Sequence, residues 1–469
     1  MEAPRASRPA GWTAGAKPTP STELRALLRI TAPLAAAYLA EMAMSFTDMA
    51  IVGRLGSVEL AAVGLAANLL VSVLFICMGV VSIVGVLVAQ AHGAGDDAAA
   101  GRGLRQGLWV ATALSVPQMA LGWYMAPLLR LTGQEEAVVL LAEQYLRAVI
   151  WCVLPYMWFT VLRNFVSALA RPGAIMVITV AAVGLNLAAC YTLVFGKFGF
   201  PALGVAGAGY GTALVSWVMF AALALHVVRS PAFRVYRPFG GLGRLDAPLL
   251  RQILRLGTPV AGLMAVEAGL FSAVAVLMGL FGATALAAHQ VAASFASLVF
   301  MVPMALGQAA TIRVAQGLGR GSVAAARQAG RLGIVVGALF MAVMAVVMWT
   351  APEAIVSLFL DTADPENAKV LALAAVLLGI AAVFQIVDGV QVIAAGALRG
   401  LKDTTAPLLV GLLGYWGVGL TAGWLLAFPL GLGGPGLWLG VAFGLAAAAV
   451  LLSWRFHART GALLRIDRR

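Results

Sequence analysis

Residues 69–90 read LLVSVLFICMGVVSIVGVLVAQ, a stretch of 22 residues without a charged side chain. A helix needs about 20 mainly apolar residues to cross the hydrocarbon core of a bilayer. Stretches of this kind recur along the whole chain, separated by charged or Gly/Pro-rich breaks. They predict twelve transmembrane helices, near residues 30–53, 58–91, 107–129, 138–162, 173–195, 203–228, 257–281, 284–312, 332–350, 370–395, 406–428 and 435–454.

The composition supports the same conclusion. Of the 469 residues, 62% are hydrophobic and 11% are charged. Soluble globular domains carry roughly 25% charged residues, so the composition excludes a soluble protein. The chain lacks ten-residue segments in which polar and apolar residues alternate, which argues against an outer-membrane β-barrel. The sequence therefore predicts an all-α membrane protein.

The net charge of +12 is distributed unevenly among the connections between the predicted spans. All but five of the 31 Lys and Arg residues fall in the termini and in alternate connections. The five are Arg54, Arg130, Arg147, Lys197 and Lys369. Because basic loops stay in the cytoplasm, we expect both termini on the cytoplasmic side. The basic residues then form a collar that faces anionic headgroups, and no nucleic-acid partner is needed to explain them.

The two halves of the chain resemble each other. A shift of 226 residues without a gap aligns Glu41 with Glu267, and over residues 56–107 it gives 18 identities in 52 positions. Chance would give roughly six for this composition. Because each half holds an even number of spans, we expect two six-helix lobes related by a pseudo-two-fold axis along the membrane normal. The lobes would face each other across a central cavity, with the functional site between or within them.

The breaks between spans also predict a division of the chain into segments. The longest connection is strongly basic and separates the two halves. The expected segments are a flexible cytoplasmic tail (1–23), an N-lobe (24–229), a cytoplasmic linker (230–256), a C-lobe (257–457) and a cytoplasmic C-terminal tail (458–469).

Four acidic residues lie well inside the predicted spans: Glu41 and Asp48 in the first, Glu267 in the seventh and Asp388 in the tenth. No Lys or Arg is expected at comparable depth to pair with them. A charged side chain at the bilayer centre costs at least ~2.5–3.5 kcal/mol, so these acids should face a protein interior or a wet cavity. Carboxylates without a counter-ion suit a transported proton or cation, and they are hard oxygen ligands of the kind that Na⁺ prefers. The alternative is that they only hydrogen-bond helices together.

Other polar residues are less informative. Asn186 and Gln290 could contact a ligand or pack between helices.

Cys77, Cys152 and Cys190 lie in apolar segments, at spacings that fit neither a disulfide framework nor a metal finger. No GxxxxGK[ST] phosphate loop is present, and no HExxH or GxSxG motif occurs in a suitable context, so neither a fused nucleotidase nor an enzyme is predicted and no cofactor is expected. A membrane-embedded transferase is the less favoured alternative. It would need paired Asp residues for a divalent metal, or a long extramembrane loop, and the longest loop of this chain is short and basic.

Three blocks of sequence resemble the multidrug and toxic compound extrusion (MATE) family, and its NorM-like bacterial branch most of all. They are PLAAAYLAEMAMSFTDMAIVGRLG at 33–56, LAAHQVAASFASLVFMVPMALGQAATIRVAQGLG at 286–319 and FQIVDGVQVIAAGALRGLKDTTAP at 384–407. The resemblance implies a twelve-helix, two-lobe antiporter that expels lipophilic cationic drugs and dyes in exchange for Na⁺ or H⁺. It also implies a monomer in the bacterial inner membrane. A lipid-linked precursor flippase of the same superfamily is the alternative.

The resemblance implies roles for individual residues as well. Asp48 occupies the family's acidic position on the first helix, and Glu267 and Asp388 occupy the C-lobe acidic pair associated with cation coupling, as possible Na⁺ ligands. Asn186 matches an N-lobe polar position, and Gln290 follows the family's AHQ block.

Two positions depart from the family's pattern. Glu41 stands where NorM-like relatives more often carry a neutral polar residue, so it could add a cation or proton site or be part of the structure. Phe384, one turn before Asp388, stands where a tyrosine hydroxyl could help to coordinate Na⁺. This second departure leaves the choice of coupling ion open.

Overall fold

The chain is built from helices joined by short turns. The computed structural model describes residues 19–131, 133–360 and 364–467, and no strand occurs within those ranges. Helices suit this sequence because a spanning segment must satisfy its own backbone hydrogen bonds in a medium without water. The prediction of an all-α protein is confirmed.

Within the described residues, eleven segments are long and apolar enough to cross a membrane, so the chain is a multi-pass membrane protein. The one predicted span that is not among these eleven is the third, near 107–129. It falls mostly in α3 (Asp97–Trp123), which is more polar because it carries Arg102, Arg105 and Gln118. The eleven are α1 (Pro20–Val52), α2 (Ser57–Ala94), the run of α5 (Glu136–Val149), η1 (Ile150–Cys152) and α6 (Val153–Ala168), α7 (Gly173–Phe195), α8 (Val205–Arg229), α10 (Ala247–Gly279), α11 (Ala283–Gly319), α12 (Val323–Thr350), α14 (Ala368–Gly400), the run of α15 (Thr405–Gly411), η3 (Leu412–Leu420) and α16 (Thr421–Ala427), and α17 (Gly433–Asp467). Four short helices complete the described chain: α4 (Met125–Leu131), α9 (Pro231–Arg234), α13 (Pro352–Val356) and η2 (Pro365–Asn367).

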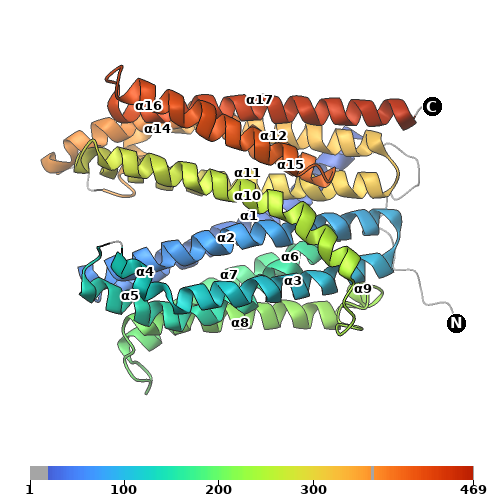
Figure 1. Cartoon of the computed structure of the whole chain (residues 1–469), viewed down its shortest axis with the longest axis horizontal. Coiled ribbons are helices and arrows are strands. Elements are labelled where there is room, and N and C mark those ends of the chain that lie inside the picture. Colours follow the sequence, from blue (N-terminus) through green and yellow to red (C-terminus); the bar gives the residue numbers. More distant parts are fainter. Residues whose placement is uncertain (1–18, 132, 361–363, 468–469) are drawn as a thin grey trace. The chain divides into compact units, whose positions relative to one another are not determined.

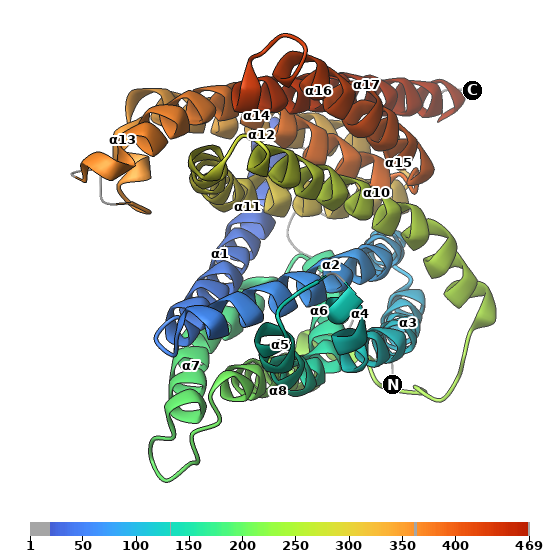
Figure 2. The same cartoon turned by 60° about the vertical axis from the view of Figure 1, so that its left-hand side comes forward.

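The helices group into two compact units. Unit 1 contains Ala36–Ala261, which is the second half of α1, the helices α2 to α9 and the start of α10. In this unit α2 packs against α3, α5 and α6, while α8 packs against α5, α6 and α7 (Figures 1 and 2). The second half of α1, which carries Glu41 and Asp48, therefore belongs to a bundle formed by the first half of the sequence.

Unit 2 contains residues 19–35 and the described residues from Gly262 onward. Its helix α14 packs against α11, α12 and α17, and α17 packs in turn against η3 and α16 (Figure 1). Because three helices surround α14, much of its length is buried inside the unit. The segment η3 is a π-helix, a wider coil than the α-helices on either side of it.

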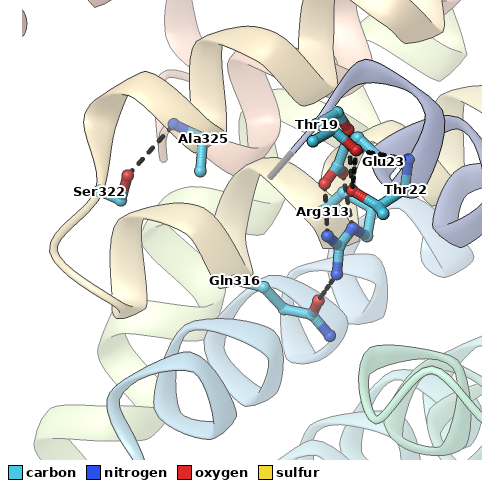
Figure 3. A network of polar contacts seen from close by, with 7 residues as sticks. All are labelled: Thr19, Thr22, Glu23, Arg313, Gln316, Ser322 and Ala325. Carbon is cyan, nitrogen blue, oxygen red and sulfur yellow. Dashed lines mark hydrogen bonds and ion pairs between the residues drawn. The ribbon is translucent and has the colours of Figure 1, made fainter. Parts of the chain in front are cut away.

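The start of α1 differs from the predicted flexible tail and from the predicted N-lobe boundary at residue 24. Residues 1–18 lie outside the described residues, but α1 begins at Pro20 and its first turns belong to unit 2. Glu23 is 1% exposed, and Arg313 of α11 donates to both its oxygens, from Nε at 2.7 Å and from Nη2 at 2.6 Å (Figure 3). The same guanidinium donates from Nη1 to Gln316 at 2.8 Å. A buried bidentate ion pair thus holds the start of α1 against α11.

The predicted C-terminal tail also differs from the structure, because α17 continues to Asp467. Asp403, in the turn after α14, accepts hydrogen bonds from Arg455 at 2.9 Å and forms an ion pair with Arg459 at 3.2 Å. These contacts anchor the polar end of α17 to unit 2. Residues 468–469 lie outside the described residues.

Part of the predicted linker (230–256) packs along α3. The side chain of Gln106 donates to the carbonyl of Arg244 at 2.8 Å and accepts from the backbone of Asp246 at 3.1 Å. Trp109 donates to the carbonyl of Leu242 at 2.7 Å. Gln106 and Trp109 of α3 therefore bind this connection.

Glycines allow α17 to approach η3 and α16 closely. A Cβ atom on Gly440 would lie 2.1 Å from the backbone nitrogen of Gly423, and one on Gly444 would lie 2.5 Å from the carbonyl oxygen of Gly414. Both distances are shorter than any van der Waals contact. Small residues at such contacts let helix backbones meet in membrane proteins.

We therefore expect Gly440→Ala to lower the melting temperature of the purified protein in detergent, because overpacking costs about 1–3 kcal/mol. Gly461→Ala, on the same helix but with no heavy atom within 4 Å, is the matched control and should melt like the parent protein. Equal melting temperatures for the two variants would contradict the close contact.

Candidate functional site

Unit 2 contains a cavity of about 150 Å³. The two acids predicted for the C-lobe, Glu267 of α10 and Asp388 of α14, both line it, together with the polar side chains of His289, Ser297 and Gln385. The remaining lining residues are apolar: Phe271, Val274, Ala293, Ala296, Phe300, Met301, Phe384, Trp438 and Val441. The structure therefore brings the predicted acid pair to one apolar chamber.

Helical spacing sets the polar face of α14. Gln385, Asp388 and Gln391 follow one another at intervals of three residues, so they lie along one side of the helix. All three are at most 4% exposed, because this side faces the interior of unit 2. The Gln385 side chain donates to the carbonyl of Ala296 on α11 at 2.8 Å, which fixes the orientation of its amide.

Four buried oxygen atoms on α14 and η3 have no hydrogen-bond partner among the described residues: Asp388 Oδ1, Gln385 Oε1, Gln391 Oε1 and Tyr415 OH. No described Lys or Arg lies within ion-pair distance of either acid. Buried polar groups in proteins are almost always satisfied. Asp388 and Gln385 line the cavity, and their partnerless oxygens therefore suit a positively charged ligand. In the described part of the chain, no cluster of three or more His, Cys, Asp or Glu side chains could hold a metal ion.

Aromatic rings meet edge to face along the cavity wall. The ring centroids of Phe271 and Phe384 are 6.3 Å apart, those of Phe384 and Trp438 are 5.9 Å apart, and those of Trp438 and His289 are 5.6 Å apart. Trp438 also donates from Nε1 to His289 Nδ1 at 3.2 Å, which holds both side chains in place. Because aromatic faces attract cations, rings and carboxyl groups together can hold an organic cation.

His289 and Gln290 are adjacent in the sequence, but their side chains have different surroundings. Gln290 is exposed and does not line the cavity, whereas His289 is 5% exposed and does. Trp438 was not singled out in the sequence, since nothing in the pattern of α17 distinguishes it from an interface tryptophan.

Asp48 is the centre of a second polar cluster, in unit 1. Its Oδ1 accepts a hydrogen bond from Asn186 of α7 at 2.6 Å and from the Cys190 thiol at 3.2 Å. Its Oδ2 accepts from Thr212 of α8 at 3.1 Å. All three donors are neutral, and no described Lys or Arg forms an ion pair with Asp48. The structure thus brings the predicted Asn186 to Asp48 and adds Cys190 and Thr212, which the sequence analysis missed.

Glu41 is not an unpaired acid, so that prediction was wrong. Arg163 of α6 donates from Nη1 to Glu41 Oε1 at 2.7 Å, and Tyr156 donates to Oε2 at 3.1 Å. The Arg163 side chain is 4% exposed and lies over the rings of Tyr38 and Phe159. The end of the fourth predicted span at residue 162 places Arg163 in a cytoplasmic connection, but α6 continues past it to Ala168.

Comparison with known sequences gives a consistent result. The sequence model of the MatE family matches residues 33–192 and 259–425, and these two matches begin 226 residues apart, at the offset of the internal repeat. The chain is 46% identical over 442 residues to a Pseudomonas aeruginosa protein named "Probable multidrug resistance protein NorM", covering 94% of this chain and 91% of that protein. A protein of the same name from Burkholderia pseudomallei is 42% identical over 468 residues, covering 98% and 99%.

Solved structures share the fold at lower identity. The crystal structure of the eukaryotic MATE transporter AtDTX14 matches with a TM-score of 0.84 and 23% identity, covering 96% of this chain and 99% of that one. A MATE structure in the bent conformation matches with a TM-score of 0.85 and 19% identity, covering 97% and 100%. At these identities the likeness concerns the fold alone.

The buried Glu41–Arg163 pair leads to a prediction about stability. Glu41→Gln should destabilise the protein by about 3–5 kcal/mol, because it leaves a guanidinium buried without a counter-charge. The double variant Glu41→Gln with Arg163→Met should lose less stability than Glu41→Gln alone, as measured by thermal unfolding in detergent. Strictly additive losses would show that the two side chains do not interact.

Proposed function

Because this chain belongs to the MatE family, we propose that it is a multidrug efflux transporter that expels lipophilic organic cations from the cell. Its relatives from Pseudomonas aeruginosa and Burkholderia pseudomallei are named as multidrug resistance proteins. The observation that carries the proposal is the cavity of unit 2, where aromatic rings and two carboxyl groups line one space. Such a lining binds a flat apolar cation through ring contacts and charge, without demanding one particular shape.

Coupling to an ion gradient follows from competition for the two carboxyl groups. In the outward-facing state, Na⁺ or H⁺ binds at Glu267 and Asp388 and removes the negative charge that held the organic cation, which then leaves. In the inward-facing state, the ion departs to the cytoplasm and another organic cation binds. Alternation around a fixed site needs no ATP and is typical of transporters built from repeats. The partnerless oxygens of Asp388 and Gln385, which both line the cavity, support this assignment.

Asp48 would be a second coupling position, one that binds H⁺. Its neutral donors Asn186, Cys190 and Thr212 hold the carboxyl group in place without cancelling its charge. Glu41 has no part in this proposal, because Arg163 already compensates it. Gln290 has none either, since it lies on the exposed side of α11.

The transporter would act as a monomer in the bacterial inner membrane, with both termini in the cytoplasm. Support comes from the bacterial relatives and from the uneven distribution of Lys and Arg among alternate connections.

The acid pair can be tested by substitution. Glu267→Gln and Asp388→Asn should each reduce ion-driven efflux of ethidium from proteoliposomes at least tenfold, which corresponds to about 1.4 kcal/mol. Glu353→Gln, which changes an exposed acid on α13, is the control and should transport normally. Normal efflux by both site variants would disprove the assignment.

The identity of the coupling ion requires imposed gradients. Efflux should follow an inward Na⁺ gradient at equal pH, and Glu267→Gln should remove that response, because the ion and the drug compete for the same charge. A pH gradient without Na⁺, applied to the Asp48→Asn variant, measures the contribution of the second site. Transport that ignores both gradients would exclude antiport.

A further inference from the structure

The cavity of unit 2 contains a titratable side chain that the proposed function does not use. His289 of α11 lines the cavity, and its Nδ1 accepts a hydrogen bond from Trp438 Nε1 at 3.2 Å. An indole N–H can only donate, so Nδ1 has to accept, and the neutral imidazole then carries its hydrogen on Nε2. This N–H has no partner among the described residues. Trp438 therefore holds His289 in the tautomer that can donate to a molecule in the cavity.

The helices α11 and α14 run parallel in one register. Gln385 of α14 donates to the carbonyl of Ala296 on α11, and these residues are 89 apart in the chain. A Cβ atom on Gly400 would lie 2.7 Å from the carbonyl oxygen of Thr311, at the same separation in sequence. Depth along one helix can therefore be compared with depth along the other.

His289 and Asp388 lie on opposite sides of the contact between Gln385 and Ala296. His289 precedes Ala296 by seven residues, and Asp388 follows Gln385 by three. At 1.5 Å per residue, their backbones are roughly 15 Å apart along the helix axes. Ser297, the hydroxyl of the lining, is level with Gln385 and so does not belong to the His289 end.

Glu267 lies at the same end as Asp388. The rings of Phe271 and Phe384 are in contact, and each phenylalanine is four residues from one of the acids. A short turn joins α10 to α11, so α10 runs antiparallel to α14. Four residues backward on α10 and four forward on α14 therefore lead in one direction. The cavity thus has carboxyl groups at one end, an imidazole at the other and aromatic rings between them.

We propose that His289 is a specificity-determining residue, whose Nε2–H selects organic cations that carry an oxygen acceptor at the end opposite their charge. The carboxyl groups bind the positive end, the aromatic rings contact the frame, and the imidazole donates to a carbonyl, ester or carboxylate oxygen. A cation without that oxygen leaves a buried donor unpaired and binds less tightly. This inference rests on the proposed function, because it names the class of cation that the same cavity selects.

Two quaternary cations of the same shape test this selection. One is a biphenylmethyl trimethylammonium ion with an acetyl group at the far end of the biphenyl. The other carries an isopropenyl group there, in which CH₂ replaces the carbonyl oxygen. Isothermal titration calorimetry measures the binding of each to the purified full-length protein in Na⁺-free buffer. The ratio of the two affinities isolates the acceptor, because a change in packing affects both cations alike.

His289→Phe should lower the acetyl-to-isopropenyl affinity ratio about fivefold, which is the effect of one net hydrogen bond. His289→Gln, whose amide nitrogen reaches as far along the side chain as Nε2, should keep the parental ratio. His289→Asn, which is polar but shorter, should not. His457→Phe, at a histidine of unit 2 outside the cavity, is the matched control and should keep the parental ratio.

NMR of the ¹⁵N-histidine-labelled protein tests the role of Trp438. The chain has four histidines, so comparison with His289→Phe assigns the His289 signals. The parent protein should show the tautomer protonated at Nε2. Trp438→Phe should mix the two tautomers and lower the affinity ratio.

Two results would overturn the inference: an affinity ratio that His289→Phe leaves unchanged, or a His289 proton on Nδ1 in the parent protein. In either case the proposed efflux function stands as long as Glu267→Gln and Asp388→Asn stop ethidium transport. A parent protein that binds neither cation would instead count against the proposed function, and the inference would fall with it.

Discussion

An ionised carboxyl group inside a membrane protein is tolerated only where positive charge, hydrogen-bond donors or water stabilise it. The buried acids of this chain meet that requirement in different ways. Glu23 and Glu41 are each paired with an arginine of the same unit, so their charge is permanently compensated. Asp48 has only neutral donors, and Glu267 and Asp388 adjoin a cavity. Acids of the first kind hold helices together, whereas acids of the second kind have no Lys or Arg within ion-pair distance among the described residues.

Much of the architecture could be predicted because two of its signals are strong. Long apolar stretches specify spanning helices almost independently of their surroundings, and the 226-residue repeat divides the chain into halves. The spacing of Gln385, Asp388 and Gln391 places them on one side of a helix wherever that helix packs. The acid pair at the cavity was therefore within reach of sequence reasoning.

The errors arose where hydropathy was used to place helix ends. Arg163 and Arg313 interrupt apolar stretches, so both were assigned to connections, although α6 and α11 continue beyond them. A buried charge can remain inside a helix when a distant acid compensates it. Glu41 and Glu23 are more than a hundred residues away in the chain, and no local pattern reveals such partners.

The contact between Glu23 and Arg313 also limits how the polypeptide can be shortened or fused. A fusion partner attached before Pro20 leaves the first turn of α1 and its carboxylate intact. A truncation that begins after Glu23 leaves the guanidinium of Arg313, which is only 12% exposed, without its counter-ion. An expressed fragment should therefore begin before Glu23. This polar stretch lies ahead of the strongly apolar part of α1, and its composition alone gives no sign that it is needed.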